Sequence, residues 1–411
     1  MPKVNTDPNL INELLERSID KIYPSKEDLK KILQSGKRLR IYNGADATGS
    51  QLHLGHSTNY ILLEKFRRLG HEVIILFGDF TAMIGDPTDK KASRTSLTKK
   101  EVDINLKTWK SQISKIVNFK DKNNPPKIVK NSKWLSKLSP IKLITLMSNF
   151  TVQQMLERDM FQKRIADHKP IFNHEFLYPL LQGYDSVALD VDVEIGGTDQ
   201  TFNMLVGRTL QQKINNKEKF VVTTTLLENP KTGKKLMSKS EGGYIGLNDS
   251  PLEMFGKTMA LPDETIISVF TDCTYVPQNE INDMKIKLET NKINPKDLKI
   301  QLGYELVKIY HNEKKALEAK ENFIKTFQKK EVPDDILEIK VSKGEELSEV
   351  LLKNNFVKSK SDFKRLIDEG AITRLEKNEN INDYHFKLTE SETLKIGKKR
   401  FIRIVFNNFH H

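Results

Sequence analysis

The stretch RLRIYNGADATGSQLHLGHSTNYILLEKFRRLGHEVIILFGDF, residues 38–80, predicts the fold of the first half of the chain. It begins with a short β-type run that ends at Gly44. A helical segment, STNYILLEKFRRLG, follows and closes at Gly70, and the apolar run HEVIILFGDF comes next. A strand, a helix and a strand in this order make a βαβ unit, which requires parallel strands. The sequence therefore predicts an α/β fold with a parallel sheet.

The composition of the chain indicates a globular protein with an anionic partner. Its 411 residues are enough for two or three domains, and 37% of them are hydrophobic. The net charge of +12 favours nucleic acid as the partner, with ATP or an anionic membrane surface as alternatives. A general enrichment in lysine would explain the same charge without any partner.

Several classes of protein are excluded by simple features. The single Cys273 excludes an internal disulfide and a cysteine-based zinc site. The N-terminal residues lack the apolar run of a signal peptide, and no segment approaches the roughly 20 apolar residues of a membrane span. We therefore expect a cytoplasmic protein without a membrane partner.

The rest of the chain is divided by its pattern into further regions. Residues 1–35, 97–117 and 139–167 have helical patterns, and the apolar face of the last segment is expected in the core, with a dimer surface as the alternative. Residues 249–330 are helical and charged. The segment EVPDD indicates a linker, taken as 331–342, because proline and paired aspartates stop a helix. A small unit of two short helices followed by strands is expected at 343–411.

The loop between the first strand and its helix has the chemistry of a phosphate site. His53 and His56 flank Gly55 at the corner where backbone N–H groups and the helix dipole favour an anion. The imidazoles can donate hydrogen bonds to phosphate oxygens, and Thr48 supplies a hydroxyl nearby. The alternative is a histidine pair that merely caps the helix. A zinc site is disfavoured because no third ligand type is present.

Two more loops carry charges suited to a polyphosphate. Residues 231–247, KTGKKLMSKSEGGYIGL, can bring ammonium groups to a pyrophosphate leaving group. Residues 78–98 follow the second strand and combine Asp79 and Asp86 with Lys90 and Arg94. Either loop alone could be a solvated charged loop.

A polar stripe interrupts the apolar segment FLYPLLQGYDSVALDVDVEIGGTDQTFN, residues 176–203. Tyr178, Gln182 and Asp185 are one helical turn apart, so they lie on one helix face. Such a face can recognise a polar amino acid, with Asp185 accepting a hydrogen bond from a phenol and remaining ionised if well paired. The alternative is a core network whose members satisfy one another.

Together the three loops resemble those of class I aminoacyl-tRNA synthetases, in which HIGH and KMSKS motifs flank ATP. His53-Leu54-Gly55-His56 matches the first motif in full. Met237 to Ser240 match the second, but its first position is Leu236, which puts the role of the first lysine on Lys234 or Lys235. The resemblance implies a Rossmann-like catalytic domain.

The chain resembles the tyrosyl-tRNA synthetases in particular. The segments IYNGADATGSQLHLGH, GDFTAMIGDPTDK and EIGGTDQTFN, together with the stripe at residues 178–185, carry this resemblance, which covers essentially the whole chain. Position 194 is Glu where other branches of the family have Gln. Tyrosyl-tRNA synthetases are the known example of a site that rejects phenylalanine because buried polar groups would be left unpaired.

The resemblance implies a role for each matched position. For the substrate tyrosine, Tyr42 and Asp185 would bind the hydroxyl, Tyr178, Gln182 and Asp86 the α-ammonium group, and Gln200 would lie near the carboxylate. For ATP, the implied residues are Asp46, Gly55, Gly197 and Asp199 at the adenosine, Thr48, His53 and His56 at the α-phosphorus and ribose, and Lys90, Arg94, Lys239 and Ser240 near pyrophosphate.

The implied reaction is a two-step ligation. Tyrosine carboxylate attacks the α-phosphorus of ATP, and the terminal adenosine of tRNA(Tyr) then attacks the adenylate; no covalent enzyme intermediate is needed. Mg²⁺ would enter with ATP, and no metal site of the protein's own is expected. The implied domains are a catalytic domain at 1–230 and a loop and anticodon-side helical domain at 231–330. A homodimer is also implied.

The C-terminal residues 343–411 resemble a small RNA-binding module of the S-four type. In that module a helix that begins with Ser presents basic residues to RNA. The residues that match are Ser361 with Lys358, Lys360, Lys364 and Arg365, and Lys398, Lys399 and Arg400 form a further basic edge. Phosphate contacts of this kind give salt-sensitive affinity and little base reading. A solvated charged face is the alternative.

Three other functions remain open at this point. A tryptophan synthetase of the same subclass is disfavoured by Tyr42, Asp185 and the C-terminal module. A cofactor adenylyltransferase also uses an HxGH loop, but it would need neither the 231–247 loop nor an RNA module. An RNA-binding homologue without activity is kept open by Leu236.

Overall fold

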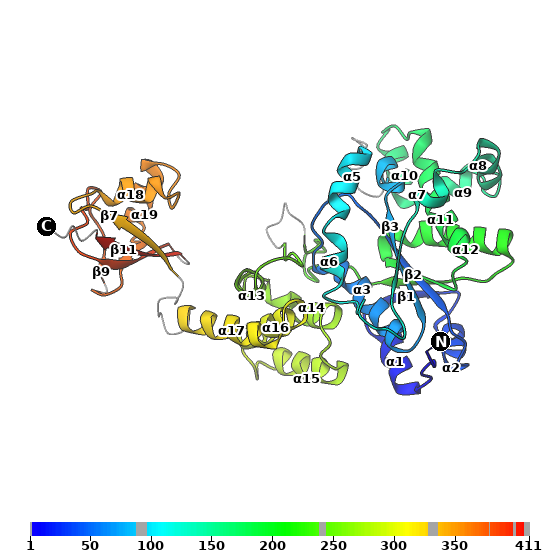
Figure 1. Ribbon diagram of the computed structural model, residues 1–411, viewed down its shortest axis with the longest axis horizontal. Coiled ribbons are helices and arrows are strands. Elements are labelled where there is room, and N and C mark those ends of the chain that lie inside the picture. Colours follow the sequence, from blue (N-terminus) through cyan, green and yellow to red (C-terminus); the bar gives the residue numbers. More distant parts are fainter. Residues whose placement is uncertain are drawn as a thin grey trace. The chain divides into compact units, whose positions relative to one another are not determined.

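The computed structural model describes residues 2–87, 97–237, 244–327, 336–377, 379–397 and 400–406. The chain forms two compact units, Met1–Lys320 and Glu321–His411, and the boundary falls within helix α17 (Glu313–Phe327). Each unit has a sheet of its own, as Figure 1 shows. The predicted α/β fold with a parallel sheet is confirmed.

The sheet of the first unit has six strands in the order β1-β6-β5-β2-β3-β4. All neighbouring pairs are parallel except β1 with β6. The strands are β1 (Ile19–Tyr23), β2 (Arg40–Asp46), β3 (Glu72–Gly78), β4 (Lys127–Lys130), β5 (Val193–Gly197) and β6 (Phe220–Thr224). The runs of β3 and β6 are almost entirely buried, as expected for parallel strands covered on both faces.

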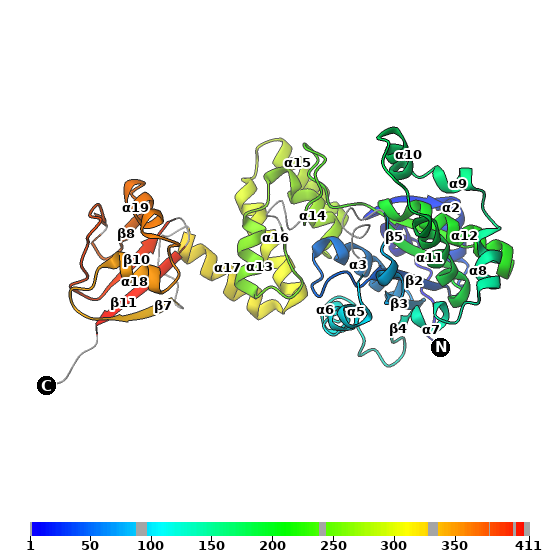
Figure 2. The ribbon, with the colours of Figure 1, turned by 90° about the horizontal axis from the view of Figure 1, so that it is seen from above.

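The chain runs from β2 toward one edge of the sheet, to β3, and from β5 toward the other edge, to β6. Helix α3 (Leu54–Arg68) joins β2 to β3, and α12 (Thr201–Asn215) joins β5 to β6. Right-handed crossovers then put α3 and α12 on opposite faces of the sheet, and Figure 2 shows α3 on one side and α11 (Leu177–Leu189) with α12 on the other. The carboxyl ends of β2 and β5 therefore form a topological switch point, where α/β sheets bind ligands.

Other helices surround this sheet or form the helical region that follows it. Around the sheet are α1 (Pro8–Glu16), α2 (Lys26–Gln34), α4 (Thr81–Ile84), α5 (Lys99–Leu106), α6 (Trp109–Ile113), α7 (Ser132–Leu135), α8 (Pro140–Met147), α9 (Val152–Leu156), α10 (Asp159–Ala166), η1 (Asn173–Phe176) and η2 (Thr198–Gln200). The helical region contains α13 (Pro251–Met259), η3 (Asp263–Thr265), α14 (Ile266–Cys273), α15 (Gln278–Glu289) and α16 (Pro295–Tyr310). Its helical character was predicted.

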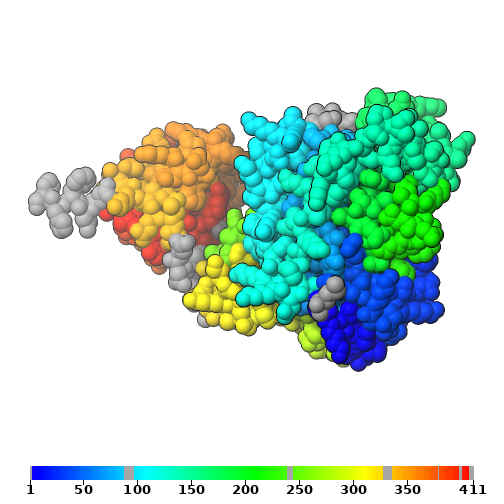
Figure 3. All heavy atoms as spheres, turned by 45° about the vertical axis from the view of Figure 1, so that its right-hand side comes forward, coloured from blue at the N-terminus to red at the C-terminus, as the bar shows by residue number. Residues whose placement is uncertain are grey.

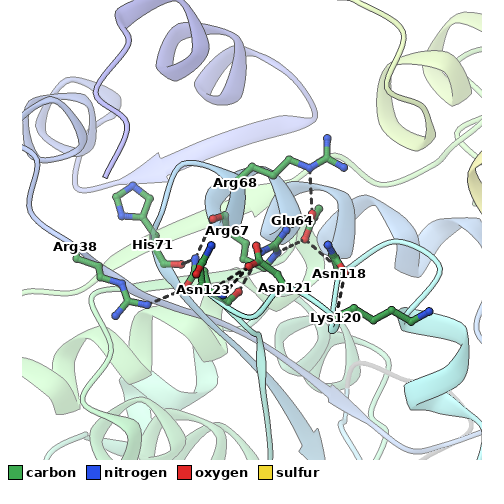
Figure 4. A network of polar contacts seen from close by, with 10 residues as sticks. Arg38, Glu64, Arg67, Arg68, His71, Asn118, Lys120, Asp121 and Asn123 are labelled. Carbon is green, nitrogen blue, oxygen red and sulfur yellow. Dashed lines mark hydrogen bonds and ion pairs between the residues drawn. The ribbon is translucent and has the colours of Figure 1, made fainter. Parts of the chain in front are cut away.

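The carboxyl end of α3 is held by a network of charges, drawn in Figure 4. Arg67 donates to both carboxylate oxygens of buried Glu64 at 2.6 and 2.8 Å, and to Asp121 at 2.6 Å. Arg68 donates to Glu64 at 3.0 Å. Such bidentate pairs fix the geometry of both partners, so α3 is anchored at the end opposite to His53.

Arg17 joins the N-terminal helix to the helical region. Its buried guanidinium donates to the carbonyl oxygens of Phe270, Thr271 and Thr274, at 3.0, 2.7 and 2.7 Å, and also to Val276. The carbonyls of Phe270, Thr271 and Thr274 lie in the last turn and at the C-cap of α14, where a helix leaves acceptors without internal partners. A cation at this end also complements the helix dipole.

The second unit packs two helices on a five-stranded sheet of order β7-β11-β10-β8-β9. Its elements are β7 (Leu337–Val341), α18 (Leu347–Lys353), α19 (Lys360–Asp368), β8 (Ile372–Arg374), β9 (Glu379–Asn380), β10 (Glu392–Ile396) and β11 (Arg400–Phe406). Its core combines Leu351 and Phe363 of the helices with Leu394, Ile402 and Ile404 of the sheet. This α+β unit has its own core, as a separate domain requires.

Two local predictions were wrong, and a third holds for only part of its segment. Residues 19–23 are strand β1 rather than helix, because they pair antiparallel with β6. The predicted linker 331–342 contains β7, which pairs parallel with β11 and buries Ile339 and Val341. In residues 139–167 the expected core face is confirmed for Leu146, Met155 and Phe161, which are 0%, 5% and 0% exposed, whereas Ile141, Ile144 and Val152 lie outside the core and are 74%, 61% and 66% exposed.

Candidate active site

The predicted ligand residues gather at the carboxyl edge of the central strands. Asp46 ends β2, Gly197 ends β5, and the helix α11 presents Tyr178, Gln182 and Asp185 toward this region. Tyr178 donates a hydrogen bond to Asp46 at 2.9 Å, which joins the helix stripe to the end of β2. The stripe and the first strand therefore contribute to one site.

Asp46 is a carboxyl group with an unusual environment. It accepts hydrogen bonds from the hydroxyls of Thr81, at 2.6 Å, and Tyr178. Removal from water and the neighbouring carboxylates of Asp86 and Asp79 raise its pKa to about 7, although the two hydroxyl donors act in the opposite direction. Asp46 can thus exchange its proton near neutral pH.

Asp185 is buried, with 2% of its surface exposed, and both of its oxygens are held by side chains. The indole of Trp134 donates to Oδ1 at 2.7 Å and the amide of Asn131 donates to Oδ2 at 3.2 Å. Burial nevertheless raises the pKa of Asp185 well above its ordinary value. Pairing therefore does not give Asp185 the ordinary carboxyl pKa that was expected from the sequence.

A chain of amides connects the stripe to Asp86. Asn203 donates to Gln182 at 2.9 Å and to Gln200 at 3.0 Å, and Gln200 donates to Asp86 at 2.7 Å. The buried guanidinium of Arg158 lies 3.7 Å from the other oxygen of Asp86. The residues expected around the α-ammonium and carboxylate groups are thus connected through Asn203, which was not predicted.

Tyr42 contacts the neighbour of Asp185 in the sequence. Its buried hydroxyl lies 2.9 Å from Ser186 Oγ, and the aromatic ring packs with Ile74 and Trp134. Asp185 and Ser186 follow each other on α11, so the hydroxyl of Tyr42 approaches the segment that carries the buried carboxylate.

The histidine pair caps α3 and also lines its N-terminus. The Nδ1 atom of His53 accepts from Gly55 N at 3.1 Å, and His56 Nδ1 accepts from His53 N at 3.2 Å. Burial lowers the pKa of His56 to about 4, so this imidazole is neutral at pH 7. A Cβ at Gly55 would lie 3.0 Å from the His53 ring, so glycine makes room for the capping imidazole.

The residues that follow the second motif contact the residues of the first motif. Leu54 N donates to Ile245 O at 3.2 Å, Leu247 N donates to Leu52 O at 2.9 Å, and the rings of His53 and Tyr244 meet edge to face. Lys235 forms an ion pair of 3.0 Å with Asp199, a residue expected at the ATP adenosine. The described residues that flank the second motif, Lys235 and Tyr244 to Leu247, therefore lie beside the first motif and Asp199.

Some predicted residues cannot be compared with the structure. Lys239 and Ser240 of the second motif lie outside the described residues, as do Lys90 and Arg94 of the loop after β3 and Lys398 and Lys399 of the basic edge. Thr48 is described and exposed, and its backbone N–H donates to Asp46 O at 2.8 Å. This bond holds Thr48 beside the end of β2, next to the site.

Several members of the site were missed from the sequence. They are Thr81, Asn131, Trp134, Arg158, Ser186, Asn203 and Lys219. Asn131 and Trp134 closely follow β4, and polar residues after a parallel strand are a usable signal for a ligand edge. Arg158 and Lys219 had no local signal, because a single cation in a Lys-rich chain is inconspicuous.

In the second unit, the expected RNA-contacting residues lie at one helix and its N-terminal turn. Lys358, Lys360, Ser361, Lys364 and Arg365 are all exposed. Lys360 lies 3.8 Å from Glu349, and Arg365 pairs with Asp362 at 2.6 Å. Exposed pairs of this kind contribute little to stability, so these cations remain accessible to an anionic partner.

The described ranges show neither a metal cluster nor a membrane-spanning helix. Residues 2–87, 97–237, 244–327 and the described parts of 336–406 contain no group of three His, Cys, Asp or Glu placed to hold a metal ion. In the same ranges, no helix is both long and apolar enough to cross a membrane.

The chain is similar to a well-defined family. A family model described as tRNA synthetases class I (W and Y) matches residues 34–328. A tyrosine–tRNA ligase from Carboxydothermus hydrogenoformans is 46% identical over 407 residues, covering 96% of this chain and 97% of the relative. One from Haemophilus influenzae is 43% identical over 403 residues, covering 98% of both.

Solved structures support the fold. A truncated mitochondrial tyrosyl-tRNA synthetase from Aspergillus nidulans matches with a TM-score of 0.64 and 21% identity, covering 77% of this chain and 94% of the other. An Archaeoglobus fulgidus tyrosyl-tRNA synthetase complexed with L-tyrosine matches with a TM-score of 0.59 and 19% identity, covering 76% and 99%. At these identities the comparison concerns the fold alone.

Asp46 gives a testable prediction about pH and stability. A carboxyl group whose pKa is raised on folding binds more protons in the folded state, so its contribution to stability is lost as pH rises from about 4 to about 7. The free energy of unfolding of Asp46→Asn, relative to that of the wild type, should therefore be about 1–3 kcal/mol higher at pH 8 than at pH 5. Urea unfolding at both pH values measures this difference.

The control is Asp283→Asn, an exposed position on α15, which should show no such pH-dependent gain. An Asp46→Asn variant that tracks the wild type at both pH values would contradict the elevated pKa.

Proposed function

Because the chain belongs to the tyrosyl-tRNA synthetases of class I, we propose that it charges tRNA(Tyr) with tyrosine at the carboxyl edge of this sheet. In the first step, a carboxylate oxygen of tyrosine attacks the α-phosphorus of ATP, and the bond to pyrophosphate breaks. In the second step, a hydroxyl of the terminal adenosine of the tRNA attacks the tyrosyl carbonyl and AMP leaves. The enzyme contributes positioning and charge stabilisation.

The observation that carries this proposal is the buried carboxyl group of Asp185. It sits beside Trp134 and Asn131, with Tyr42 bonded to the next residue of α11. We propose that the substrate phenol donates to Asp185 and accepts from Tyr42. A phenylalanine side chain would form neither of these two hydrogen bonds and would place an apolar ring edge against two buried polar groups, which is costly.

The amino-acid head group is proposed to bind at the other end of the stripe. Tyr178, Gln182 and Asp86 would surround the α-ammonium group, with Gln200 near the carboxylate. The amide chain through Asn203 supports this, because it holds Gln182 and Gln200 in fixed orientations. The Tyr178–Asp46 bond also keeps a carboxyl group next to the proposed cation site.

ATP is proposed to bind between the two motif loops. Asp46, Gly55, Gly197 and Asp199 would meet the adenosine, while Thr48, His53 and His56 would face the ribose and α-phosphate. The neutral state of His56 supports this role, since its capping geometry needs an unprotonated Nδ1.

Pyrophosphate would then be met by the charged loops. Lys90, Arg94, Lys239 and Ser240 are proposed there, and Mg²⁺ is proposed to enter with ATP. Lys235 bonds to Asp199, so ATP binding would release its ammonium group. This supports Lys235 as the cation that replaces the motif lysine missing at Leu236.

The second unit is proposed to bind tRNA. Its exposed cations at α19 suit a phosphate backbone, and its separate core supports an independent RNA-binding domain at the end of the chain. We also propose that the helical region after residue 231 faces the anticodon side. A cytoplasmic location is proposed because that is where the tRNA partner is used.

We further propose that the protein is a homodimer formed through α8 to α10. The exposed apolar residues of this segment are Ile141, Ile144, Met147, Val152 and Ile165. Figure 3 shows the segment, in blue-green, on the surface of the first unit. A surface segment with this many exposed apolar side chains is typical of a protein interface.

The proposed activity is tested by amino-acid-dependent ATP–pyrophosphate exchange with Asp185→Asn. The variant keeps the shape of the side chain but replaces one acceptor oxygen by an NH₂ donor, so kcat/KM for tyrosine should fall about 100-fold or more. Asp190→Asn, at the C-cap of the same helix, is the control and should keep normal exchange. Wild-type exchange in Asp185→Asn would refute the phenol role.

The wild-type protein separates the competing functions in the same assay. Tyrosine should support exchange. Exchange with tryptophan or with a phosphopantetheine-type substrate would redirect the assignment, and the lack of exchange with all of these substrates would favour an RNA-binding homologue without activity.

The dimer proposal predicts that Ile141→Glu with Ile144→Glu produces a monomer. Charges at these positions would be buried without partners in the interface, and sedimentation velocity measures the change. Ile286→Glu, 58% exposed on α15, is the matched control and should remain dimeric. A double variant that sediments as a dimer would contradict the assigned face.

The RNA proposal predicts the effect of replacing Lys358, Lys360 and Lys364 by Gln. Affinity for tRNA should fall, and the slope of log K against log salt should become shallower by about 1 for each phosphate that is no longer neutralised. Tyrosine-dependent exchange should stay normal. The control is Lys31→Gln with Lys37→Gln, two exposed lysines of the first unit. If both variants had the same slope of log K against log salt, the α19 surface would not be the one that binds tRNA.

A further inference from the structure

Lys219 is a buried cation that none of the roles above uses. It directly precedes β6, and its exposed surface is 0%. Its ammonium group forms an ion pair with Glu194 and donates to Ser186 Oγ at 2.8 Å. A lysine is almost never fully buried without a partner, so this arrangement needs a reason.

Two glycines leave space for the ammonium group of Lys219. Helices α11 and α12 cross at two glycines, and a Cβ on Gly183 would lie 3.0 Å from Gly207 N. A Cβ on Gly207 would lie 2.7 Å from Lys219 Nζ and 2.9 Å from Ser186 Oγ. The close crossing therefore leaves room at Gly207 for the lysine and the serine together.

The sheet register brings Tyr42 to the same place. Tyr42 and Glu194 are neighbours across the parallel pair β2 and β5, so their side chains point to the same face. The Tyr42 hydroxyl lies 2.9 Å from Ser186 Oγ, and Ser186 Oγ lies 3.3 Å from Glu194. One serine hydroxyl thus contacts the lysine, the glutamate and the tyrosine.

Counting donors and acceptors gives this cluster a direction. An ammonium group only donates, so Ser186 Oγ must accept from Lys219. The single serine proton is then available for Tyr42 or Glu194. Ser186 Oγ can donate to Glu194 at 3.3 Å or to Tyr42 at 2.9 Å, and the contact with Tyr42 is the shorter one. Glu194 already accepts from the ammonium of Lys219, so a Ser186 proton given to Tyr42 leaves no charged group without a partner.

We propose that Lys219 is a positioning residue for tyrosine specificity, which acts through Ser186 on the hydroxyl of Tyr42. This inference rests on the proposed function. Hydrogen bonds would run in one direction, from Lys219 to Ser186, to Tyr42, to the substrate phenol and finally to Asp185. The buried cation starts this relay and the buried carboxylate ends it, so Tyr42 donates to the phenolic oxygen while the phenol proton goes to Asp185.

Such a relay favours tyrosine over phenylalanine at two points. Hydrogen bonds in a chain polarise one another, and those to charged groups are the stronger ones. Phenylalanine offers neither a donor nor an acceptor, so both ends of the relay would face an apolar ring. The relay therefore adds selectivity without any contact between Lys219 and the substrate.

Ser186→Ala tests the relay with the smallest change to packing. It removes the connecting hydroxyl and leaves the Lys219–Glu194 pair in place. The ratio of kcat/KM for tyrosine to that for phenylalanine in ATP–pyrophosphate exchange should fall about 10-fold or more, mainly through a higher KM for tyrosine. Ser268→Ala on α14 is the control and should keep the wild-type ratio.

The double variant Lys219→Met with Glu194→Gln separates the relay from a merely structural ion pair. It removes both charges, so no buried ion is left unpaired, and thermal stability should stay near the wild-type value. The tyrosine to phenylalanine ratio should still fall as in Ser186→Ala. A structural role would lower exchange with both amino acids equally and leave the ratio unchanged.

The outcomes distinguish this proposal from the one on which it rests. A wild-type ratio in Ser186→Ala, or in a folded double variant, would overturn the relay while leaving the tyrosine assignment intact. Absence of tyrosine-dependent exchange in the wild-type protein would overturn the proposed function, and the relay with it.

Discussion

The clustering of four carboxyl groups, two of them buried and two partly buried, around the central strands of a parallel sheet is the constraint on which the rest of the first unit depends. Asp46, Asp86, Asp185 and Glu194 influence one another electrostatically, as the elevated pKa values of Asp46 and Asp185 reflect. Removing such groups from water is costly unless each one is paired or hydrogen-bonded. The surrounding residues supply the cations and hydrogen-bond donors that these carboxyl groups need.

The cations and donors beside the four carboxyl groups come from many separate elements. Two buried cations, Arg158 and Lys219, face Asp86 and Glu194. Neutral donors serve the other two carboxyl groups, Thr81 and Tyr178 at Asp46, and Asn131 and Trp134 at Asp185. Because β2, β5 and α11 supply three of the carboxyl groups, and the partners come from α4, α11, the segment after β4 and the residues preceding α10 and β6, the site can exist only when the sheet is assembled. A site of this kind is held at the expense of stability, as is common where proteins bind ligands.

The sequence predicted the parts of this arrangement that depend on local pattern. The βαβ unit, the stripe on α11 and the capped histidines all follow from residues close in the chain, so their spacing was informative. The strand β1 was missed because its partner β6 lies far along the chain, with Ile19 opposite Thr224, and no local period reveals such a pairing. The face of residues 139–167 that is rich in Leu, Met and Phe was expected in the core, and Leu146 and Phe161 are buried there, but periodicity gave no sign that Ile141 of the same segment is exposed. Lys219 was missed for the same reason as β1, since its partners Ser186 and Glu194 are distant in sequence.

The account centres on a buried carboxylate that receives the phenol of tyrosine. A crystal structure of the protein with bound L-tyrosine tests this most directly. We expect the phenolic oxygen within hydrogen-bond distance of both Asp185 and Tyr42, with the α-ammonium group near Tyr178 and Gln182. A tyrosine bound with its ring elsewhere, or an Asp185 that keeps only Trp134 and Asn131 as partners in the complex, would contradict the account.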